Sequence, residues 1–191
     1  MDDNDETRVV GDLPRLANVL HKQEIAEVLF RRVRASDRRD IELALTCYHD
    51  GATEEHEGFS GTAVEFLSEH SMSAPTSTGQ VTCLWHSLTN VLIDLQGEDA
   101  NVESYYFGVV VRNSDQGSMH CQIGGRYVDK FAYRNSRWAI THRTVVCDWS
   151  KVAPAAPSYW ELTGQDETKI IKGVFGSGDP LYAAFDLARG Y

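Results

Sequence analysis

Asp37 continues an apolar stripe in the N-terminal part of the chain. It lies one four-residue step beyond three apolar residues at that same spacing, Ile25, Leu29 and Val33. A helix with this spacing would turn the Asp37 carboxylate toward the core, where a charge is costly unless it is paired and hydrogen-bonded. The spacing also allows a simpler interpretation, in which Asp37 is a water-exposed acid at the end of the helix.

His86 is the second candidate for chemistry, and it lies in the apolar segment LWHSLTNVLIDL. In a regular strand, alternation places His86 on one face together with Asn90, Leu84, Leu88, Leu92 and Asp94. A mostly apolar face with a few polar groups is typical of a pocket wall, and an imidazole that titrates near neutral pH suits general base catalysis. Both faces of the segment are mixed, so the pattern leaves open whether His86 faces a pocket, the core or the outside.

Arg143 directly follows His142, so only one of the two can face the interior of a sheet. An interior guanidinium would require an anion or a developing negative charge, and a surface charge is the equally open alternative. Tyr105, Tyr106 and Phe107 could supply large amphipathic walls to a pocket, although a tyrosine pair on a strand more often serves packing. Arg126, Tyr127 and Asp129 leave the same alternatives open as Arg143.

The run EEHE at 54–57 has three acids around His56, and carboxylates and imidazole are metal ligands. The HExxH spacing of a helical zinc site is absent, and we expect the run to lie in a short edge strand. The motifs GxGxxG, GxxxxGK(S/T) and GxSxG are also absent, which removes support for nucleotide binding and for a hydrolase nucleophile elbow. We therefore expect neither a metal nor a cofactor.

The elements that would position these residues fall into two groups along the chain. Helical periodicity comes first, over residues 13–36 with Pro14 near the start, then over 41–48 and 62–70. Four long strands rich in β-branched and aromatic residues follow, at 81–95, 102–112, 119–133 and 138–149. This order predicts an α+β fold, in which an antiparallel meander curves into a cone, three N-terminal helices wrap it and its open end forms a pocket.

The ends of the chain differ from this central part. Residues 1–12 are acidic and polar and predict a disordered tail, whereas residues 13–150 form the expected cone domain. Residues 151–191 form a C-terminal extension that contains three prolines and a short predicted helix at 180–187. We expect this extension to pack over the mouth of the pocket or on a neighbouring subunit.

Length and composition exclude several classes of protein. The 191 residues suffice for one domain with a substantial core, and the formal net charge of −10 argues against a general affinity for nucleic acid or anionic membranes. No apolar run approaches the roughly 20 residues that span a bilayer, and the N-terminus lacks a secretory or transit signal, so we expect a cytoplasmic protein. The four cysteines form no CxxC pair, and we expect them to be buried small apolar residues.

Four blocks of the sequence carry a family resemblance: HKQEIAEVLFRRVRASDRRDIELALTCYHDGA, EEHEGFSGTAVEFL, WHSLTNVLIDLQGEDANVESYY and GGRYVDKFAYRNSRWAITHRTVVCDWS. Together they resemble the SnoaL-like branch of the superfamily that includes ketosteroid isomerase, scytalone dehydratase and nuclear transport factor two. The resemblance covers about residues 15–150, and the functional relatives that it suggests are hexachlorocyclohexane dehydrochlorinase, scytalone dehydratase and bile acid 7α-dehydratase. It is more specific for the fold than for the reaction, because this scaffold hosts many functions.

The resemblance implies a catalytic dyad made of a helix-borne aspartate and a strand-borne histidine. Asp37 in ASDRRD and His86 in HSLTN match the two local patterns, and Arg143 follows a tryptophan by five residues, as an arginine of the last strand often does in the family. Arg32 stands where the dehydrochlorinase has a lysine, and Tyr105 or Tyr106 where the bile acid enzyme has another acid. The implied substrate contacts are Arg32, Tyr48, His56, Asn90, Tyr106 and Tyr127.

The activity implied by the resemblance is that of a cofactor-independent lyase, a dehydratase or related elimination enzyme, acting on an apolar small molecule such as a steroid, terpenoid, polyketide or aryl compound. The alternatives are an isomerase acting on a ketone and a noncatalytic ligand-binding or structural subunit of the same fold. Several dehydratases of the family are trimers, so we expect a homo-oligomer, with a trimer favoured. Its interface would use the sheet face opposite His86, with Trp85, Val91, Ile93 and Leu95.

Overall fold

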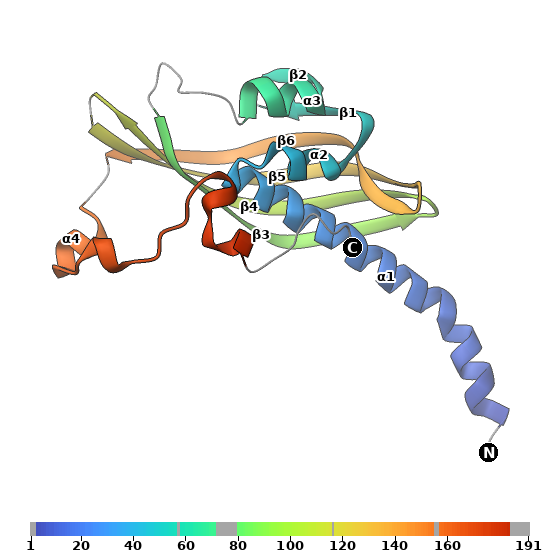
Figure 1. Cartoon of the computed structure of the whole chain (residues 1–191). Helices are drawn as coiled ribbons and strands as arrows, with labels where there is room; N and C mark the ends of the chain where they lie inside the picture. The colour runs from blue at the N-terminus through green and yellow to red at the C-terminus, as the bar shows by residue number, and fades with distance from the viewer. Residues whose placement is uncertain (1–2, 57, 72–79, 116, 155–156, 184–191) are drawn as a thin grey trace.

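The computed structural model describes residues 3–56, 58–71, 80–115, 117–154 and 157–183. These residues form a six-stranded sheet with the strand order β2-β1-β6-β5-β4-β3 (Figure 1). The strands are β1 (Tyr48–His56), β2 (Phe59–Thr62), β3 (Gln80–Gln96), β4 (Asp99–Ser114), β5 (Gly117–Arg134) and β6 (Arg137–Pro154). Strands β3 to β6 pair as an antiparallel meander, which confirms the four strands and the α+β class expected from the sequence.

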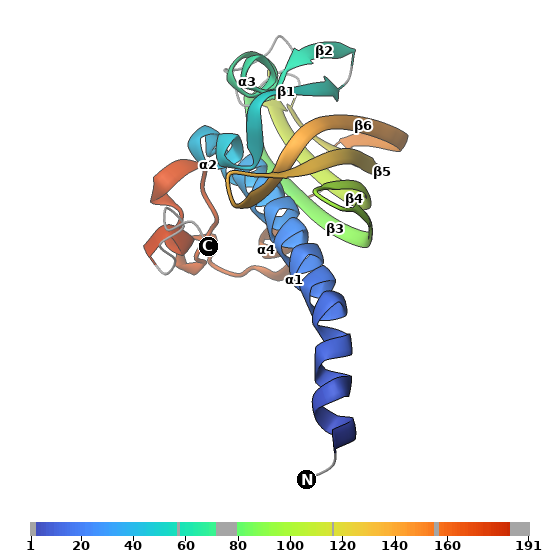
Figure 2. The same ribbon diagram turned by 90° about the vertical axis from the view of Figure 1, so that its right-hand side faces the viewer.

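The helices cover the inner side of this sheet, which curves around the C-terminal half of α1 (Figure 2). They are α1 (Asp3–Arg38), α2 (Ile41–Thr46) and α3 (Ala63–Glu65), which continues as a π-helical segment at Phe66–Ser71. Ile25 and Leu29 of α1 are buried in one core cluster with Phe131 of β5 and Ile140 of β6. The periodic stripe of α1 therefore faces the sheet as the sequence predicts.

The first half of α1 projects away from the sheet (Figure 1), and its Leu16 and Leu20 are exposed. The helix begins at Asp3, so it includes residues for which the sequence predicts a disordered tail. Pro14 lies inside α1 instead of at its start. Because the helix continues on both sides, the proline removes one backbone hydrogen bond without ending it.

A β-bulge at Asn90 changes the faces of β3. The register with β4 shifts between Thr89 and Leu92, and Asn90 adopts a positive φ of 48°. An extra residue reverses the alternation beyond it, so Val91 packs against the core while Leu92 is 67% exposed. The expectation that Leu92 shares a face with His86 is therefore wrong, and so is the expectation that Val91, Ile93 and Leu95 belong to the opposite face.

Strand β1 also differs from its prediction as an edge strand. It lies between β2 and β6, antiparallel to β2 and parallel to β6. Its residues alternate in burial, with Ala52 and Glu54 buried and Thr53 and Glu55 exposed. Of the two acids of the run that lie in β1, Glu54 thus faces the interior of the fold and Glu55 faces solvent, because successive side chains of a strand point to opposite faces.

The C-terminal extension begins later than residue 150, because Lys151–Pro154 still pair with β5. Beyond β6 the chain forms α4 (Tyr159–Thr163) and short 3-10 turns at Glu167–Lys169, Gly176–Gly178 and Pro180–Ala183. The last turn coincides with the start of the predicted helix at 180–187, whose remainder lies outside the described residues.

Two further expectations can be compared with the structure. Only Cys47 is buried, whereas Cys83 and Cys147 are exposed, so the prediction of uniformly buried cysteines is wrong. Among the described residues, no helix is long and apolar enough to cross a membrane.

Candidate active site

Asp37 and His86 form a hydrogen-bonded pair between α1 and β3. Asp37 Oδ1 lies 2.6 Å from Nδ1 of the His86 ring, and Asp37 Oδ2 accepts a hydrogen bond of 3.1 Å from the His86 backbone N–H. Asp37 is only 8% exposed, at the last step of the apolar stripe that begins at Ile25. The burial of this carboxylate is therefore compensated by two donors of one residue.

A glycine makes room for the His86 ring on the neighbouring strand. Gly108 of β4 is the cross-strand partner of His86, and a Cβ atom at Gly108 would lie 3.1 Å from His86 Cδ2. On the same strand, the ring of Tyr106 contacts the imidazole edge-on, with centroids 6.3 Å apart. The ring of Tyr106 in turn stacks on Tyr127 of β5 at 4.5 Å. Aromatic rings thus extend the wall that begins at His86.

His86 lines a pocket of about 700 Å³ between the end of α1, β1, β2 and the inner face of β3 to β6. Its apolar lining is supplied by Val33, Phe59, Phe66, Val81, Leu84, Val110, Ile123 and Val145. Its titratable lining comprises Arg32, Arg39, Glu54, His56, His86, Tyr106, Arg112, Tyr127 and Arg143. The pocket thus joins apolar walls with a few charged groups, which is typical of a small-molecule site.

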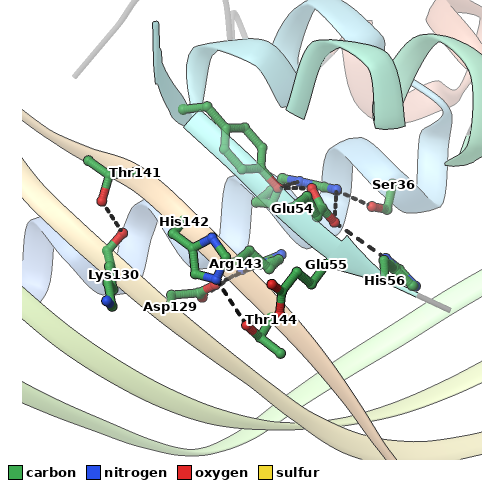
Figure 3. A network of polar contacts seen from close by, with 12 residues as sticks. Ser36, Glu54, Glu55, His56, Asp129, Lys130, Thr141, His142, Arg143 and Thr144 are labelled. Atoms are coloured by element: carbon green, nitrogen blue, oxygen red, sulfur yellow. Dashed lines mark hydrogen bonds and ion pairs between the residues drawn. The ribbon is translucent and has the colours of Figure 1, made fainter. Parts of the chain in front are cut away.

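Glu54 is the centre of a buried polar network on the wall formed by β1 (Figure 3). Its Oε2 accepts a hydrogen bond of 2.7 Å from the Tyr48 hydroxyl, and its Oε1 lies 3.3 Å from Nδ1 of His56 and 3.7 Å from Nη2 of Arg32. Arg32 also donates from Nε to the Tyr48 hydroxyl at 2.8 Å and from Nη1 to Ser36. Each side chain of this network therefore has at least one polar partner within it.

Electrostatics inside this network keep Glu54 ionised. Burial by itself would raise the pKa of Glu54, but the charge of Arg32 and the hydrogen bonds from His56 and Tyr48 lower it to about 2. Burial has the opposite consequence for Tyr48, whose pKa it raises well above the usual range. The network therefore presents an anionic carboxylate beside His56, together with a phenol that retains its proton.

Arg143 of β6 is 2% exposed and forms a bidentate ion pair with Asp129 of β5. Its Nε donates to Oδ1 at 2.7 Å and its Nη2 to Oδ2 at 2.8 Å. Its guanidinium also lies over the ring of Tyr127, 4.3 Å from the centroid. Burial would lower the pKa of Arg143, and the Asp129 carboxylate raises it above the ordinary value.

His142 takes the opposite orientation. Its Nδ1 contacts the Thr53 hydroxyl at 2.7 Å. Its Nε2 contacts the Thr144 hydroxyl at 3.0 Å (Figure 3). The sequence predicts that only one of the neighbours His142 and Arg143 faces inward, and the structure identifies Arg143 as that residue.

Most residues predicted from the sequence gather at the pocket. Its lining contains Arg32, His56, His86, Tyr106, Tyr127 and Arg143. Asp37 and Tyr48 stand behind it as hydrogen-bond partners of lining residues. Asn90, which the sequence also predicts to contact the substrate, is instead exposed at the β-bulge and is not among the residues that line the pocket.

The sequence analysis took Glu54 only as part of a candidate metal cluster, left the orientation of Asp129 open and gave no site role to Arg39 or Arg112. Glu54 had a usable signal, because Ala52, Glu54 and His56 alternate along one segment and Ala52 is apolar. Arg39 had none, since its place at the pocket depends on how α1 ends. Among the described residues, no group of three or more His, Cys, Asp or Glu side chains is arranged to hold a metal ion.

Comparisons with known proteins agree with this fold. The family model of the SnoaL-like domain matches residues 17–144. The chain belongs to the SnoaL-like family. No curated protein matches the sequence.

Solved structures of this family's fold superpose on most of the SnoaL-like chain. A candidate scytalone dehydratase from Novosphingobium aromaticivorans has a TM-score of 0.57 at 16% identity, covering 74% of this chain and 95% of its own. A hexachlorocyclohexane dehydrochlorinase from Novosphingobium barchaimii has a TM-score of 0.55 at 17% identity, covering 77% and 96%. A nuclear transport factor 2-like protein from Salmonella enterica has a TM-score of 0.59 at 19% identity, covering 75% and 98%. At these low sequence identities, the structural similarity shows that the proteins share a fold.

Proposed function

We propose that this SnoaL-like protein is a cofactor-independent lyase that eliminates water, or a related leaving group, from an apolar small molecule with His86 as the general base. The observation that supports the proposal best is the pair of hydrogen bonds that Asp37 accepts from His86 at the wall of the pocket. The candidate dehydratase and the dehydrochlorinase of the same fold add support, since both names denote eliminations.

The base in this mechanism is Nε2 of His86. With Asp37 bound at Nδ1, the ring carries its proton on that nitrogen and presents Nε2 to the substrate. His86 removes a proton from a carbon next to an activating carbonyl or aryl group. The Asp37 carboxylate stabilises the imidazolium that forms. General base catalysis of this type contributes roughly 10²–10⁴-fold, and orientation in the pocket supplies the remainder.

The acid that protonates the leaving group is His56 in our proposal. It lines the pocket on the β1 wall, where Glu54 binds its Nδ1 and Phe66 stacks on its ring at 4.6 Å. The tyrosines are poorer candidates for this role. Burial raises the pKa of Tyr127 to about 12, and the Tyr48 hydroxyl already donates to Glu54. A carboxylate-bound imidazole transfers protons far more readily near neutral pH.

Arg143 acts in this proposal as a fixed positive charge at the inner end of the pocket. Its ion pair with Asp129 holds the guanidinium in place, and the Tyr127 ring packs against one face of it. A preorganised charge of this kind stabilises negative charge as it develops on a departing hydroxide, halide or enolate oxygen, without a reorganisation cost during the reaction.

The substrate class follows from the lining of the pocket. Aliphatic side chains of α1 and the sheet, with Phe59 and Phe66 from the opposite side, favour a fused-ring or aryl compound. A volume of about 700 Å³ is within the range of sites that enclose drug-sized ligands. A steroid, terpenoid, polyketide or aryl substrate is consistent with this volume and lining.

The test is an elimination assay with bicyclic and tricyclic β-hydroxy ketones, run in EDTA with deuterium at the carbon between the carbonyl and carbinol carbons. The expected result is growth of conjugated enone absorbance, slowed by the deuterium and abolished by His86→Ala. The outer-face variant Arg126→Ala is the matched control and should retain activity.

Other outcomes of this assay would overturn the lyase proposal. Migration of a double bond without loss of water would identify an isomerase on the same dyad. Saturable binding of the ketones without turnover of any of them would identify a noncatalytic ligand-binding protein. Loss of activity in EDTA with recovery on adding zinc or iron would contradict the expectation of a metal-free reaction.

A further inference from the structure

Two arginines that the proposed reaction does not use lie at one end of the pocket. Arg39, just after α1, and Arg112, near the end of β4, both line it. Nη2 of Arg39 donates to the carbonyl of Val81 at 3.2 Å, and Val81 is the cross-strand partner of Arg112. The two guanidinium groups are therefore held near each other, although they repel. The charge of Arg112, after burial, lowers the pKa of Arg39.

Arg39 differs from other arginines around the pocket in its partners. Arg32, Arg38 and Arg143 each pair with a carboxylate, of Glu54, Asp179 and Asp129 respectively. Among the residues that the structure describes, the polar partner of Arg39 is a neutral carbonyl. A guanidinium at a pocket wall without a carboxylate partner favours binding of an external anion.

The backbone at Arg39 supports a role beyond ending the helix. Arg39 has a φ of 55°, in the left-handed region that residues with a Cβ atom disfavour and where a helix end most often has glycine. The backbone N–H of Arg39 donates a hydrogen bond of 3.1 Å to the carbonyl of Ser36. The backbone N–H of Asp40 donates one of 2.9 Å to the carbonyl of Ala35. These two backbone hydrogen bonds cap the helix without a side chain at residue 39, so the guanidinium of Arg39 does not take part in the capping.

The C-terminal extension fixes Arg39 in place. The ring of Phe175 packs against its guanidinium, 4.1 Å from carbon to centroid. The segment around Phe175 is held to the end of α1 by an ion pair of 3.2 Å between Asp179 and Arg38, and by a hydrogen bond of 2.6 Å from Tyr182 to Asp40. The extension thus braces the helix end that carries Arg39.

We propose that Arg39 and Arg112 form an anion subsite that binds a carboxylate or phosphoryl group on an otherwise apolar ligand. Arg112 lies four residues along β4 from Gly108, the partner of His86, which corresponds to roughly 13 Å along the strand. The apolar side chains of the cross-strand pair Leu84 and Val110 lie between these two ends, and Val81 lies beside Arg112. The ligand therefore carries its anion about three fused rings away from the atoms that face His86.

The subsite belongs to the same pocket as the proposed reaction, but its test requires no turnover. The probes are anthracene carboxylate, anthracene phosphonate and the neutral methyl anthracenyl ketone, titrated against the full chain by fluorescence. At least one anion should bind the wild-type protein roughly tenfold more tightly than the ketone, as expected for hydrogen bonds between charged groups. Added salt should reduce this preference.

Variants then assign the preference to the two arginines. Arg39→Gln and Arg112→Gln should each remove most of the preference for the anion while the affinity for the ketone stays unchanged. Phe175→Leu should reduce the preference for the anion only in part, because this substitution removes the ring that packs against Arg39 and leaves both arginines in place. Arg126→Gln on the outer face is the matched control and should leave all three affinities as in the wild type. Arg39→Gly is the second variant, since a φ of 55° suits glycine and the protein should fold at least as well.

Three outcomes would overturn the subsite. The anions and the ketone could bind the wild-type protein equally, or the variants could weaken all three probes to the same degree, which would assign the arginines to packing. A preference that persists in the Arg39→Gln/Arg112→Gln double variant would place the anion elsewhere. None of these results would bear on elimination by His86, which the enone assay measures separately.

Discussion

Asp37 engages His86 through both carboxylate oxygens, one at the ring nitrogen Nδ1 and one at the backbone N–H of the same residue. This double contact ties the end of α1 to β3 and fixes the imidazole in one orientation. The bond from the backbone N–H holds the carboxylate in place on β3, so the bond at Nδ1 defines the position of the ring. The pair is therefore built as a unit, and its two members should behave as one in mutagenesis.

Removing either member of the pair should abolish most turnover. His86→Ala should reduce kcat by roughly 10²–10⁴-fold, the usual share of general base catalysis. Asp37→Asn should have a comparable effect, because the amide can select the wrong tautomer and no longer stabilises the imidazolium. The double variant should be scarcely slower than either single variant. In the wild type, kcat/KM should rise with pH through the range in which imidazoles titrate. Losses of kcat that add up in the double variant would contradict the dyad. Asp94→Asn, at an exposed acid of β3, is the control and should leave kcat unchanged.

Gly108→Ala should impair catalysis more than folding. The new methyl group would lie 3.1 Å from Cδ2 of His86, closer than ordinary contact, so the ring must shift away from its position on Asp37. The required shift is a few tenths of an ångström. Because a misplacement of about 1 Å costs on the order of 10²-fold in rate, we expect a smaller loss, of about 3–10-fold. We expect kcat to fall while the thermal unfolding temperature changes by only a few degrees. Val109→Ala, the adjacent substitution on the other face of β4, should leave kcat unchanged.

Glu54 should make the folded state sensitive to acid. Its pKa of about 2 in the folded protein lies below its ordinary value of 4.5, so its contribution to stability is complete above the ordinary value. That contribution is lost as the pH falls through the folded-state pKa. The free energy of unfolding, measured with urea between pH 5 and pH 2, should therefore fall less steeply in Glu54→Gln than in the wild type. Glu55→Gln, at the exposed neighbour, should follow the wild-type curve.

The buried ion pair of Arg143 and Asp129 should be costly to break and inexpensive to replace. Asp129→Asn leaves a buried guanidinium without its counter-ion and should cost about 3–5 kcal/mol of unfolding free energy. The double variant Arg143→Met/Asp129→Leu should recover much of this loss, because it removes both charges. Turnover should stay low in the double variant, since the fixed positive charge is gone. A double variant that is both stable and fully active would show that the pair has a purely structural role.

The outer face of the sheet should mediate assembly into the expected homo-oligomer, with a trimer favoured. Trp85, Phe107 and Trp149 form an exposed aromatic cluster there, with ring centroids 6.3 and 6.0 Å apart. Gly124 leaves the space that the Trp149 ring occupies against the sheet. Trp85→Ser/Trp149→Ser should shift the mass found by sedimentation equilibrium toward that of a single chain. Leu162→Ser on α4 should not. A wild-type protein that sediments as a single chain at micromolar concentration would refute this expectation.

Local periodicity in the sequence determined which side chains of regular elements face inward. The four-residue stripe of α1 predicted that Ile25, Leu29 and Val33 share one buried face, because a helix repeats its faces whatever it packs against. It made Asp37 a candidate inward carboxylate but left the water-exposed interpretation open. Strand alternation predicted that only one of His142 and Arg143 faces inward. The helices-then-strands order predicted the α+β class. Each of these features is a property of one short segment, because the periodicity of a helix or strand is set by the residues of that segment alone.

Only the tertiary structure decided the features that depend on interruptions or on distant partners. The bulge at Asn90 reversed the faces of β3, and nothing in LWHSLTNVLIDL marks that position as the one where alternation breaks. Glu54 is buried because pairing with β2 and β6 encloses β1, and its charge is stable there because α1 brings Arg32 to it. Arg39 reaches the pocket because α1 ends in a left-handed turn braced by Phe175, a residue 136 positions further along the chain. Sequence spacing cannot encode such contacts, since the free energy that fixes them arises between segments that meet only in the folded chain.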